Sequence, residues 1–463
     1  MFYRLSETVA LRGWKDAPFA YYRKGEAYAK PLRFSEYVTL LLCDGHNDLP
    51  LNDTIQKLLD FGMIVPCREG EEPSSWSAAR KFDNNYMPKM ILMITGKCNY
   101  NCLHCFNAAD NAPLMSEWDF EELCRLLDEC ADCGVNAVTL TGGEPMAHGR
   151  FADILKEIHA RGMYVEELNT NGYFITQGVL DLMKSIGCRP LMKISFDGIG
   201  YHDWMRSFQG AEERTLKAIR LCVENAFSVK VQTQANRRNV GALLPTARLL
   251  AETGVSEMRV IRTTEAPRWE KNAKGASLSV EEYYEEMLRF VREYAASGLD
   301  IDLAVWQFAD ICARNKTYRI VPVMMPCGKY DPMHPACADI RRMLAVSSSG
   351  EAVPCLQMSG YFAEHGISFG NLHRKSLREF LNGGALWDTI CLTAEDIRGH
   401  NGKCTSCGYF ELCAGGCRAL GGLHSGEPLD LAAPDPTKCF FFENGWHRRI
   451  AEALKGWTNL TPF

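Results

Sequence analysis

Three closely spaced cysteines, Cys98, Cys102 and Cys105, are the first residues of the sequence that could carry chemistry. They follow the apolar run MILMIT in the loop GKCNYNCLHCFN, with the spacing C-x3-C-x2-C. Three thiolates in one short loop can bind three irons of a four-iron cluster, which leaves the fourth iron without a protein ligand. A zinc site is the alternative, but zinc is typically bound by four ligands in paired spacing. The spacing therefore predicts an iron–sulfur cluster with one open iron.

Other short motifs accompany this loop, and each ends an apolar run. TLTGGEP contains Gly142, Gly143 and Glu144, NTNG covers 169–172, and SFDG covers 195–198. Together with the cysteine loop, these motifs resemble those of the radical S-adenosylmethionine superfamily. An iron without a protein ligand can chelate S-adenosylmethionine (SAM), and an electron from the cluster can then break a C–S bond of its sulfonium. The resemblance implies an enzyme that generates a 5′-deoxyadenosyl radical.

The same resemblance assigns contacts with SAM to individual residues. The glycine turn would let backbone carbonyls approach the ammonium of SAM closely. Ser195 would hydrogen-bond the carboxylate, Arg214 would meet the same carboxylate, and Asn171 would lie beside the ribose. The superfamily prefers an aromatic residue before the third cysteine; here it is His104, whose backbone is expected to meet the adenine. The predicted cofactor-binding residues are Gly142, Gly143, Glu144, Asn171, Ser195, Arg214 and His104.

Six short apolar or β-branched runs alternate with amphipathic stretches of helical length after Met90. This alternation predicts a parallel sheet, and six repeats indicate a partial (β/α)6 TIM-like barrel of the α/β class. Chemistry in such barrels gathers at the carboxyl ends of the strands, where the cysteine loop and the three motifs are expected. The expected strands are MILMIT, AVTLTG, VEELNT, LMKISFD, VKVQTQ and MRVIRT.

A second group of cysteines lies between residues 327 and 439. Its central run is KCTSCGYFELCAGGC, in which Gly415-Gly416 offers the tight loop that a buried cluster needs. The pattern resembles the SPASM extension of radical enzymes that modify peptides, and the resemblance implies two auxiliary [4Fe–4S] clusters. The first would take Cys327, Cys337, Cys355 and Cys417, and the second would take Cys404, Cys407, Cys413 and Cys439.

This crossing of the two ligand sets follows from the resemblance alone. Spacing by itself would group Cys404, Cys407, Cys413 and Cys417. Cys327 also lies farther from its neighbour in the set than in sulfatase maturases, and without it the first auxiliary cluster would have an open iron. Such clusters could accept the electron that a substrate radical loses when a new bond closes, or they could simply brace the fold.

Residues 1–70 form a separate unit in which strand-like runs precede two helices and a closing strand. This order of elements is typical of a winged-helix domain, a class that often binds DNA. Its helix LNDTIQKLLDF has two aspartates and one lysine, however, so it would bind DNA phosphates poorly. The predicted domains are a winged-helix peptide-recognition unit at 1–70, a linker at 71–89, the barrel at 90–310, the SPASM domain at 311–445 and a C-terminal tail at 446–463.

Composition limits the compartment and the partners. The formal net charge of −6 lacks the basic surplus of a nucleic-acid-binding protein, and no apolar run could span a bilayer. The N-terminal run MFYRLSETVALRGW is charged and lacks the apolar stretch of a signal peptide. Clustered cysteines in a reducing compartment indicate metal rather than disulfides, whereas Cys130 and Cys133 are expected in the core. We therefore expect a cytoplasmic protein with no nucleic-acid or membrane partner.

A winged-helix unit ahead of a radical SAM/SPASM core resembles enzymes that mature ribosomally made peptides. In that family the leader of the precursor peptide pairs with the N-terminal domain as an added strand. The expected reaction is a thioether or carbon–carbon cross-link in the precursor peptide, with flavodoxin or ferredoxin as electron donor. Oxidation of one side chain, as in sulfatase maturation, and a winged-helix redox regulator are the alternatives. The catalytic base is unassigned, although Asp197 and Glu265 lie at predicted strand ends.

Overall fold

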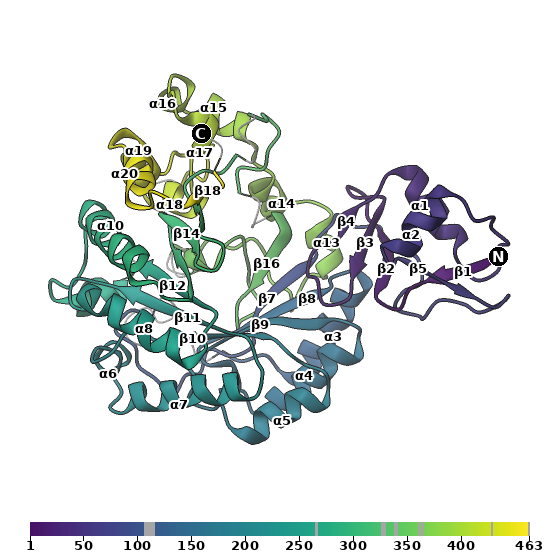
Figure 1. Ribbon diagram of the computed structural model, residues 1–463, viewed down its shortest axis with the longest axis horizontal. Coiled ribbons are helices and arrows are strands. Elements are labelled where there is room, and N and C mark those ends of the chain that lie inside the picture. Colours follow the sequence, from purple (N-terminus) through teal and green to yellow (C-terminus); the bar gives the residue numbers. More distant parts are fainter. Residues whose placement is uncertain are drawn as a thin grey trace.

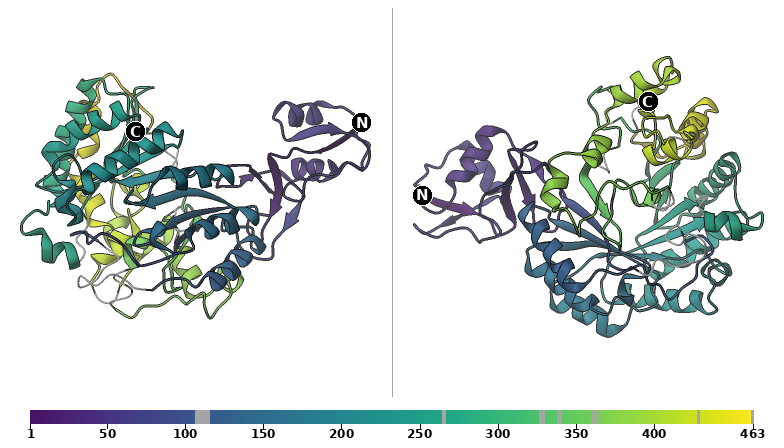
Figure 2. Two further views of the ribbon diagram at one scale, coloured as in Figure 1. Left: turned by 90° about the horizontal axis from the view of Figure 1, so that it is seen from below. Right: turned by 180° about the vertical axis from the view of Figure 1, so that it is seen from behind.

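The computed structural model describes residues 1–105, 116–263, 267–325, 330–337, 341–359, 362, 365–426 and 429–461. Two residues singled out by the sequence, Glu265 and Cys327, lie outside this part of the chain. Figures 1 and 2 show an N-terminal unit at one end of the molecule, beside a large sheet that carries helices on its outer side. Across the described residues, no helix is long and apolar enough to cross a membrane.

The N-terminal unit consists of two small sheets and two helices. β1 pairs antiparallel with β5, while β2, β3 and β4 form an antiparallel meander. Both predicted helices are present: α1 buries Tyr37 and Leu40 but leaves Leu41 and Leu42 of its apolar run exposed, and α2 buries Ile55 and Leu58. The winged-helix class of the unit remains a prediction. Its elements are β1 (Phe2–Leu5), β2 (Val9–Gly13), β3 (Ala20–Arg23), β4 (Lys30–Pro31), α1 (Phe34–Leu42), α2 (Asp53–Asp60) and β5 (Ile64–Cys67).

The segment predicted as a linker is folded against its neighbours. Within it, β6 (Arg80–Lys81) pairs parallel with β2, and Phe82 stacks on Trp14 with ring centroids 5.5 Å apart. Trp14 Nε1 donates a hydrogen bond of 3.1 Å to Cys133 O, at the end of α3 (Phe120–Asp132). These buried contacts hold the N-terminal unit against the first strand–helix repeat of the large sheet.

The six predicted strands lie side by side in the order of the sequence, and they are parallel. They are β7 (Lys89–Met93), β8 (Ala137–Thr141), β9 (Tyr164–Thr170), β10 (Leu191–Ser195), β11 (Val229–Ala235) and β12 (Glu257–Arg262). Alternate strand residues such as Val138 and Leu140 are wholly buried. In Figure 1 the outer face of the sheet carries α3, α4 (Phe151–Ala160), α5 (Gln177–Ser185), α7 (Ala211–Glu224) and α8 (Leu243–Thr253).

The sheet is longer than six strands because later parts of the chain extend it at both edges. One added strand pairs parallel with β7, another pairs parallel with β12, and the last comes from the segment predicted as a tail. Residues on both sides of the predicted boundary at 310 thus share one sheet with the barrel. The added strands are β13 (Asp302–Val305), β14 (Ala309–Cys312), β15 (Thr317–Ile320), β16 (Met343–Val346), β17 (Ala352–Val353) and β18 (Thr458–Asn459).

The C-terminal segment consists mainly of short helices joined by loops. Its last helix packs on α10 (Val280–Ser297), where Trp446 is buried and Arg449 pairs with Glu285 at 2.8 Å. The predicted tail therefore includes a helix that belongs to the main body. The helices of the segment are α13 (Leu377–Leu381), α14 (Ala385–Ile390), α15 (Ala394–His400), α16 (Gly402–Thr405), α17 (Phe410–Cys413), α18 (Arg418–Leu423), α19 (Pro436–Glu443) and α20 (Trp446–Ala453).

Candidate functional site

The cysteine loop follows β7 and rests on the glycine turn that follows β8. Gly143 N–H donates to Thr95 O at 2.7 Å, and Glu144 N–H donates to Lys97 O at 2.8 Å. A Cβ atom at Gly142 would overlap Thr95 O, and a Cβ atom at Gly143 would overlap Lys97 O. The two glycines therefore allow the turn to approach the backbone that leads into the cysteine loop, a role that the sequence motif did not reveal.

Replacing Gly143 by alanine is expected to displace the cysteine loop. Overpacking of this kind typically costs about 1–3 kcal/mol of stability, because the neighbouring backbone must move. The stability measured by chemical denaturation and the iron content of the purified variant should both be lower than those of the native chain. Gly149→Ala is the matched control, because no atom lies within 4 Å of the added Cβ. Equal stability and iron content in the two variants would contradict this role for Gly143.

Glu144 joins the ends of two neighbouring strands through a fully buried carboxylate. The carboxylate accepts hydrogen bonds from the Thr170 hydroxyl at 2.9 Å, from Asn171 N–H at 2.8 Å and from Met146 N–H at 3.3 Å. Burial raises the pKa of Glu144 to about 7, although these donors oppose the shift. Both carboxylate oxygens thus have partners within the protein, and Glu144 positions the strand end that carries Asn171.

Cys98 receives hydrogen bonds from two directions. Tyr100 N–H donates to Cys98 Sγ at 3.4 Å, and Asn171 Nδ2 lies 3.8 Å from the same sulfur and donates to Asn99 Oδ1 at 2.9 Å. Burial raises the pKa of the Cys98 thiol to about 12, so the thiolate needs a neighbouring cation to form at neutral pH. Iron would supply that charge, and the donor set therefore fits a thiolate-bound cluster.

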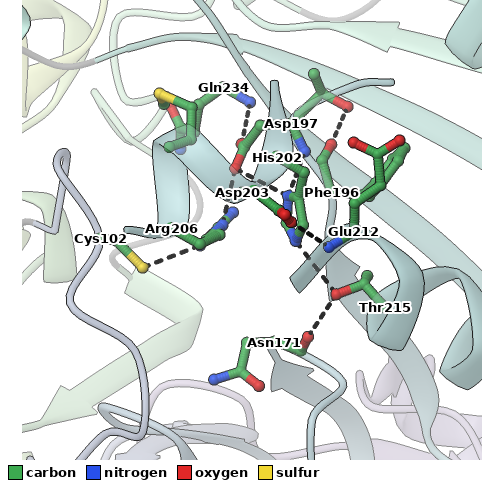
Figure 3. A network of polar contacts seen from close by, with 12 residues as sticks. Cys102, Asn171, Phe196, Asp197, His202, Asp203, Arg206, Glu212, Thr215 and Gln234 are labelled. Atoms are coloured by element: carbon green, nitrogen blue, oxygen red, sulfur yellow. Dashed lines mark hydrogen bonds and ion pairs between the residues drawn. The ribbon is translucent and has the colours of Figure 1, made fainter. Parts of the chain in front are cut away.

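Figure 3 shows a buried ion pair that reaches a second cysteine of the loop. Arg206 Nε donates to Asp197 Oδ2 at 2.7 Å, and Arg206 Nη1 lies 3.6 Å from Cys102 Sγ. Asp197 Oδ1 also accepts from Gln234 N–H at 3.1 Å, and its own N–H donates to His202 Nδ1 at 3.0 Å. The Arg206 guanidinium holds the pKa of the Asp197 carboxyl well below its usual range despite burial. Asp197 is therefore a charged partner of Arg206, which does not suit a proton acceptor.

Sequence reasoning missed Arg206. It lies in α6 (His202–Arg206), and it is 7% exposed. An arginine shortly after SFDG in HDWMRS is an ordinary surface pattern, so no sequence signal indicated that the side chain is buried. Only the fold brings it to the cysteine loop.

The three remaining predicted cofactor residues lie on separate elements: Ser195 on β10, Arg214 on α7 and His104 in the cysteine loop. Ser195 ends β10 and is half-buried, and the exposed Arg214 on α7 places its guanidinium 4.8 Å from the ring centroid of Tyr173. Burial, with a smaller effect of Arg206, lowers the pKa of His104 to about 3, so its imidazole is neutral. The sequence also gave no indication that Tyr173 belongs to an aromatic cluster that lies against the cysteines.

The second cysteine group is divided in space. Cys404, Cys407, Cys413 and Cys439 line one cavity together with aromatic side chains from α17 and α19. Cys417 instead packs with Cys355 against a core that includes Val353 and Ala419. The cavity thus gathers the cysteines of the crossed set rather than four cysteines that are consecutive in the sequence.

Two buried cations lie between these cysteine groups. Lys438 and Arg418 are each less than 4% exposed, and Arg418 donates to Ala433 O at 2.9 Å. Burial lowers the pKa of both side chains; Cys417 opposes this shift at Arg418, and Asp435 opposes it at Lys438. Within the described residues, no three His, Cys, Asp or Glu side chains surround a single-ion site. A four-iron cube places each thiolate on a separate iron, so its ligands stand farther apart than around one ion.

Comparison with known families agrees with this arrangement. Residues 92–234 match the radical SAM superfamily, and residues 337–408 match SPASM, an iron-sulfur cluster-binding domain. AdoMet-dependent heme synthase from Methanosarcina barkeri (strain Fusaro / DSM 804) is 26% identical over 349 residues, which are 74% of this chain and 95% of the relative. PqqA peptide cyclase from Gluconobacter oxydans (strain 621H) is 25% identical over 386 residues, which are 81% of this chain and 96% of the relative.

Solved structures with low identity share the fold. Streptococcus suis SuiB bound to precursor peptide SuiA has a TM-score of 0.67 at 14% identity and covers 95% of this chain and 100% of its own. The anSMEcpe protein with bound AdoMet has a TM-score of 0.58 at 17% identity and covers 80% of this chain and 95% of its own. The two domain matches imply iron–sulfur clusters and SAM binding. This chain is therefore an enzyme that contains a radical SAM domain over residues 92–234 and an iron–sulfur cluster-binding SPASM domain over residues 337–408.

Proposed function

We propose that this enzyme modifies a ribosomally made precursor peptide and installs a thioether or a carbon–carbon cross-link. The observation that carries the proposal is the N-terminal unit packed on the radical SAM/SPASM core. A fold match that covers 95% of the chain must extend into this unit, and the matched structure is of SuiB with a precursor peptide. The PqqA peptide cyclase named above also acts on a peptide by its name.

In this proposal three [4Fe–4S] clusters are held by cysteines alone. Cys98, Cys102 and Cys105 hold the radical cluster, and an electron donor of the flavodoxin or ferredoxin class reduces it. When bound there, SAM supplies the 5′-deoxyadenosyl radical. Asn171, Ser195 and Arg214 orient SAM. The auxiliary sets are Cys404, Cys407, Cys413 and Cys439 for one cluster, and Cys337, Cys355, Cys417 and Cys327 for the other.

The leader of the peptide would bind at β4, an edge strand of the N-terminal sheet. An added strand contributes main-chain hydrogen bonds and requires no basic charge. β4 is followed at once by α1, whose Phe34, Val38 and Leu41 are 65%, 36% and 40% exposed. These side chains recur at the helical spacing that aligns them on one face, and they offer apolar contacts beside the strand edge.

Charged substitutions on this face test the proposal. Phe34→Glu with Val38→Glu should weaken binding of the short peptide encoded beside the gene by about tenfold or more, since each lost apolar contact is worth about 1–2 kcal/mol. Uncoupled cleavage of SAM should stay unchanged, because the cluster cysteines all lie beyond β7. Phe61→Glu is the control, as Phe61 is 67% exposed at the end of α2. Peptide turnover equal to that of the native enzyme would contradict leader binding at this face.

A tetrapyrrole substrate is the second candidate, because the heme synthase relative matches 74% of the chain. Incubation with an iron tetrapyrrole, SAM and dithionite distinguishes the two. A changed product spectrum together with an unmodified peptide would favour the second candidate, and oxidation of a single peptide residue would indicate sulfatase-type maturation instead.

A further inference from the structure

A single polar network contacts two of the three cysteines in the cysteine loop, and Figure 3 shows the part of it that reaches Cys102. At one end, Arg206 Nη1 lies 3.6 Å from Cys102 Sγ, and at the other end Asn171 Nδ2 lies 3.8 Å from Cys98 Sγ. Both donors come from elements outside the loop, namely α6 and the end of β9. The N–H groups that contact these two sulfur atoms therefore belong to parts of the fold outside the cysteine loop.

Asp197 fixes Arg206 in this position. Its carboxylate is wholly buried, and Arg206 Nε donates to it at 2.7 Å. A buried guanidinium without a paired charge would be strongly unfavourable, so the ion pair keeps both charges in the core. The planar guanidinium then directs one nitrogen to the carboxylate and another to the sulfur, a geometry that a lysine ammonium reproduces only in part.

His202 connects the two ends of the network. Its Nδ1 accepts from Asp197 N–H at 3.0 Å, so the proton of the neutral ring is on Nε2, which donates to Thr215 Oγ1 at 3.2 Å. The Thr215 hydroxyl in turn donates to Asn171 O at 3.2 Å. Burial lowers the pKa of His202, which agrees with a neutral ring. His202 and Thr215 thus link Asp197, the partner of Arg206, to the backbone of Asn171.

We propose that Arg206 is a positioning residue of the radical cluster, whose hydrogen bond to the Cys102 thiolate makes the cluster easier to reduce. The inference rests on the proposed assignment of Cys98, Cys102 and Cys105 as cluster ligands. Reduction adds one electron to the cluster and raises the negative charge on its sulfur atoms, and an N–H donor of positive charge stabilises that form. In the experiment, sodium dithionite supplies the electron.

The test is a redox titration of the loaded enzyme, followed by electron paramagnetic resonance of the signal that changes when SAM is added. Arg206→Gln should shift the midpoint potential of this signal to a more negative value, with an equilibrium constant for reduction lowered about tenfold. Arg206→Lys retains the charge and should lie between Arg206→Gln and the native enzyme. Arg268→Gln is the matched control, because Arg268 is also buried and donates to Asn101 O of the same loop at 3.2 Å.

The outcomes separate this role from others. A midpoint potential unchanged in Arg206→Gln, or shifted equally in Arg268→Gln, would overturn the inference. Loss of the SAM-sensitive cluster from Arg206→Gln and from Arg206→Lys, measured by iron content, would also overturn it and would assign Arg206 to loop folding alone. If Cys102→Ala keeps the SAM-sensitive signal, the ligand assignment itself is wrong, and that result is distinct from a failure of the Arg206 variants.

Discussion

Replacing Cys98, Cys102 and Cys105 together by alanine is expected to abolish cleavage of SAM. The variant should lose about four irons per chain, because no thiolate remains in the loop to hold a cube. The auxiliary clusters should persist, since their cysteines belong to the C-terminal segment. Iron analysis and chromatography for 5′-deoxyadenosine and methionine under dithionite provide the measurement.

The control for this variant uses cysteines that are buried without a proposed ligand role. Cys188 and Cys222 are wholly buried in the apolar core of the sheet and its helices. Cys188→Ala with Cys222→Ala should lower stability modestly and leave iron content and SAM cleavage in place. Production of 5′-deoxyadenosine by the triple variant of the loop would exclude its cysteines as the site of radical formation.

The second large effect concerns how the auxiliary cysteines are grouped. If Cys413 and Cys439 bind one cluster, the double alanine variant should lose no more iron than the more severe single variant, about four atoms per chain. A double variant of Cys413 and Cys417 should lose about eight, because its residues belong to different clusters. Iron and sulfide analysis with Mössbauer spectroscopy measures the losses.

The two double variants control each other, since each removes two cysteines from the same small domain. Equal iron loss in both would contradict the crossed ligand sets. The reverse pattern, with about four irons lost without Cys413 and Cys417 and about eight lost without Cys413 and Cys439, would favour grouping by spacing. The cavity lined by Cys404, Cys407, Cys413 and Cys439 is the structural reason to expect unequal losses.

Local sequence patterns predicted the elements whose position depends on residues close to one another in the sequence. The helices α3, α7 and α8 begin and end within a few residues of the amphipathic stretches that the sequence predicts as helices, 119–133, 212–225 and 240–253. Apolar spacing and end signals such as Asp119 act over one or two turns. The parallel order of β7 to β12 also followed from alternation of strand and helix. The extra strands at the sheet edges did not, since pairing of β16 with β7 depends on segments about 250 residues apart, and no local periodicity encodes such a partner.

The sequence by itself predicted the radical chemistry, because the three cysteines proposed to leave one iron open lie within eight residues of each other, from Cys98 to Cys105. Only the tertiary structure decided which groups surround those thiolates. Arg206 and Cys102 are 104 residues apart, and the arginine is buried there only because Asp197 at the end of β10 offers a paired charge in the same place. Cys439 on α19 likewise lines the same cavity as Cys404 on α16. A charged or polar side chain gains such a role from desolvation and from fixed partners, and both arise only when distant segments pack together.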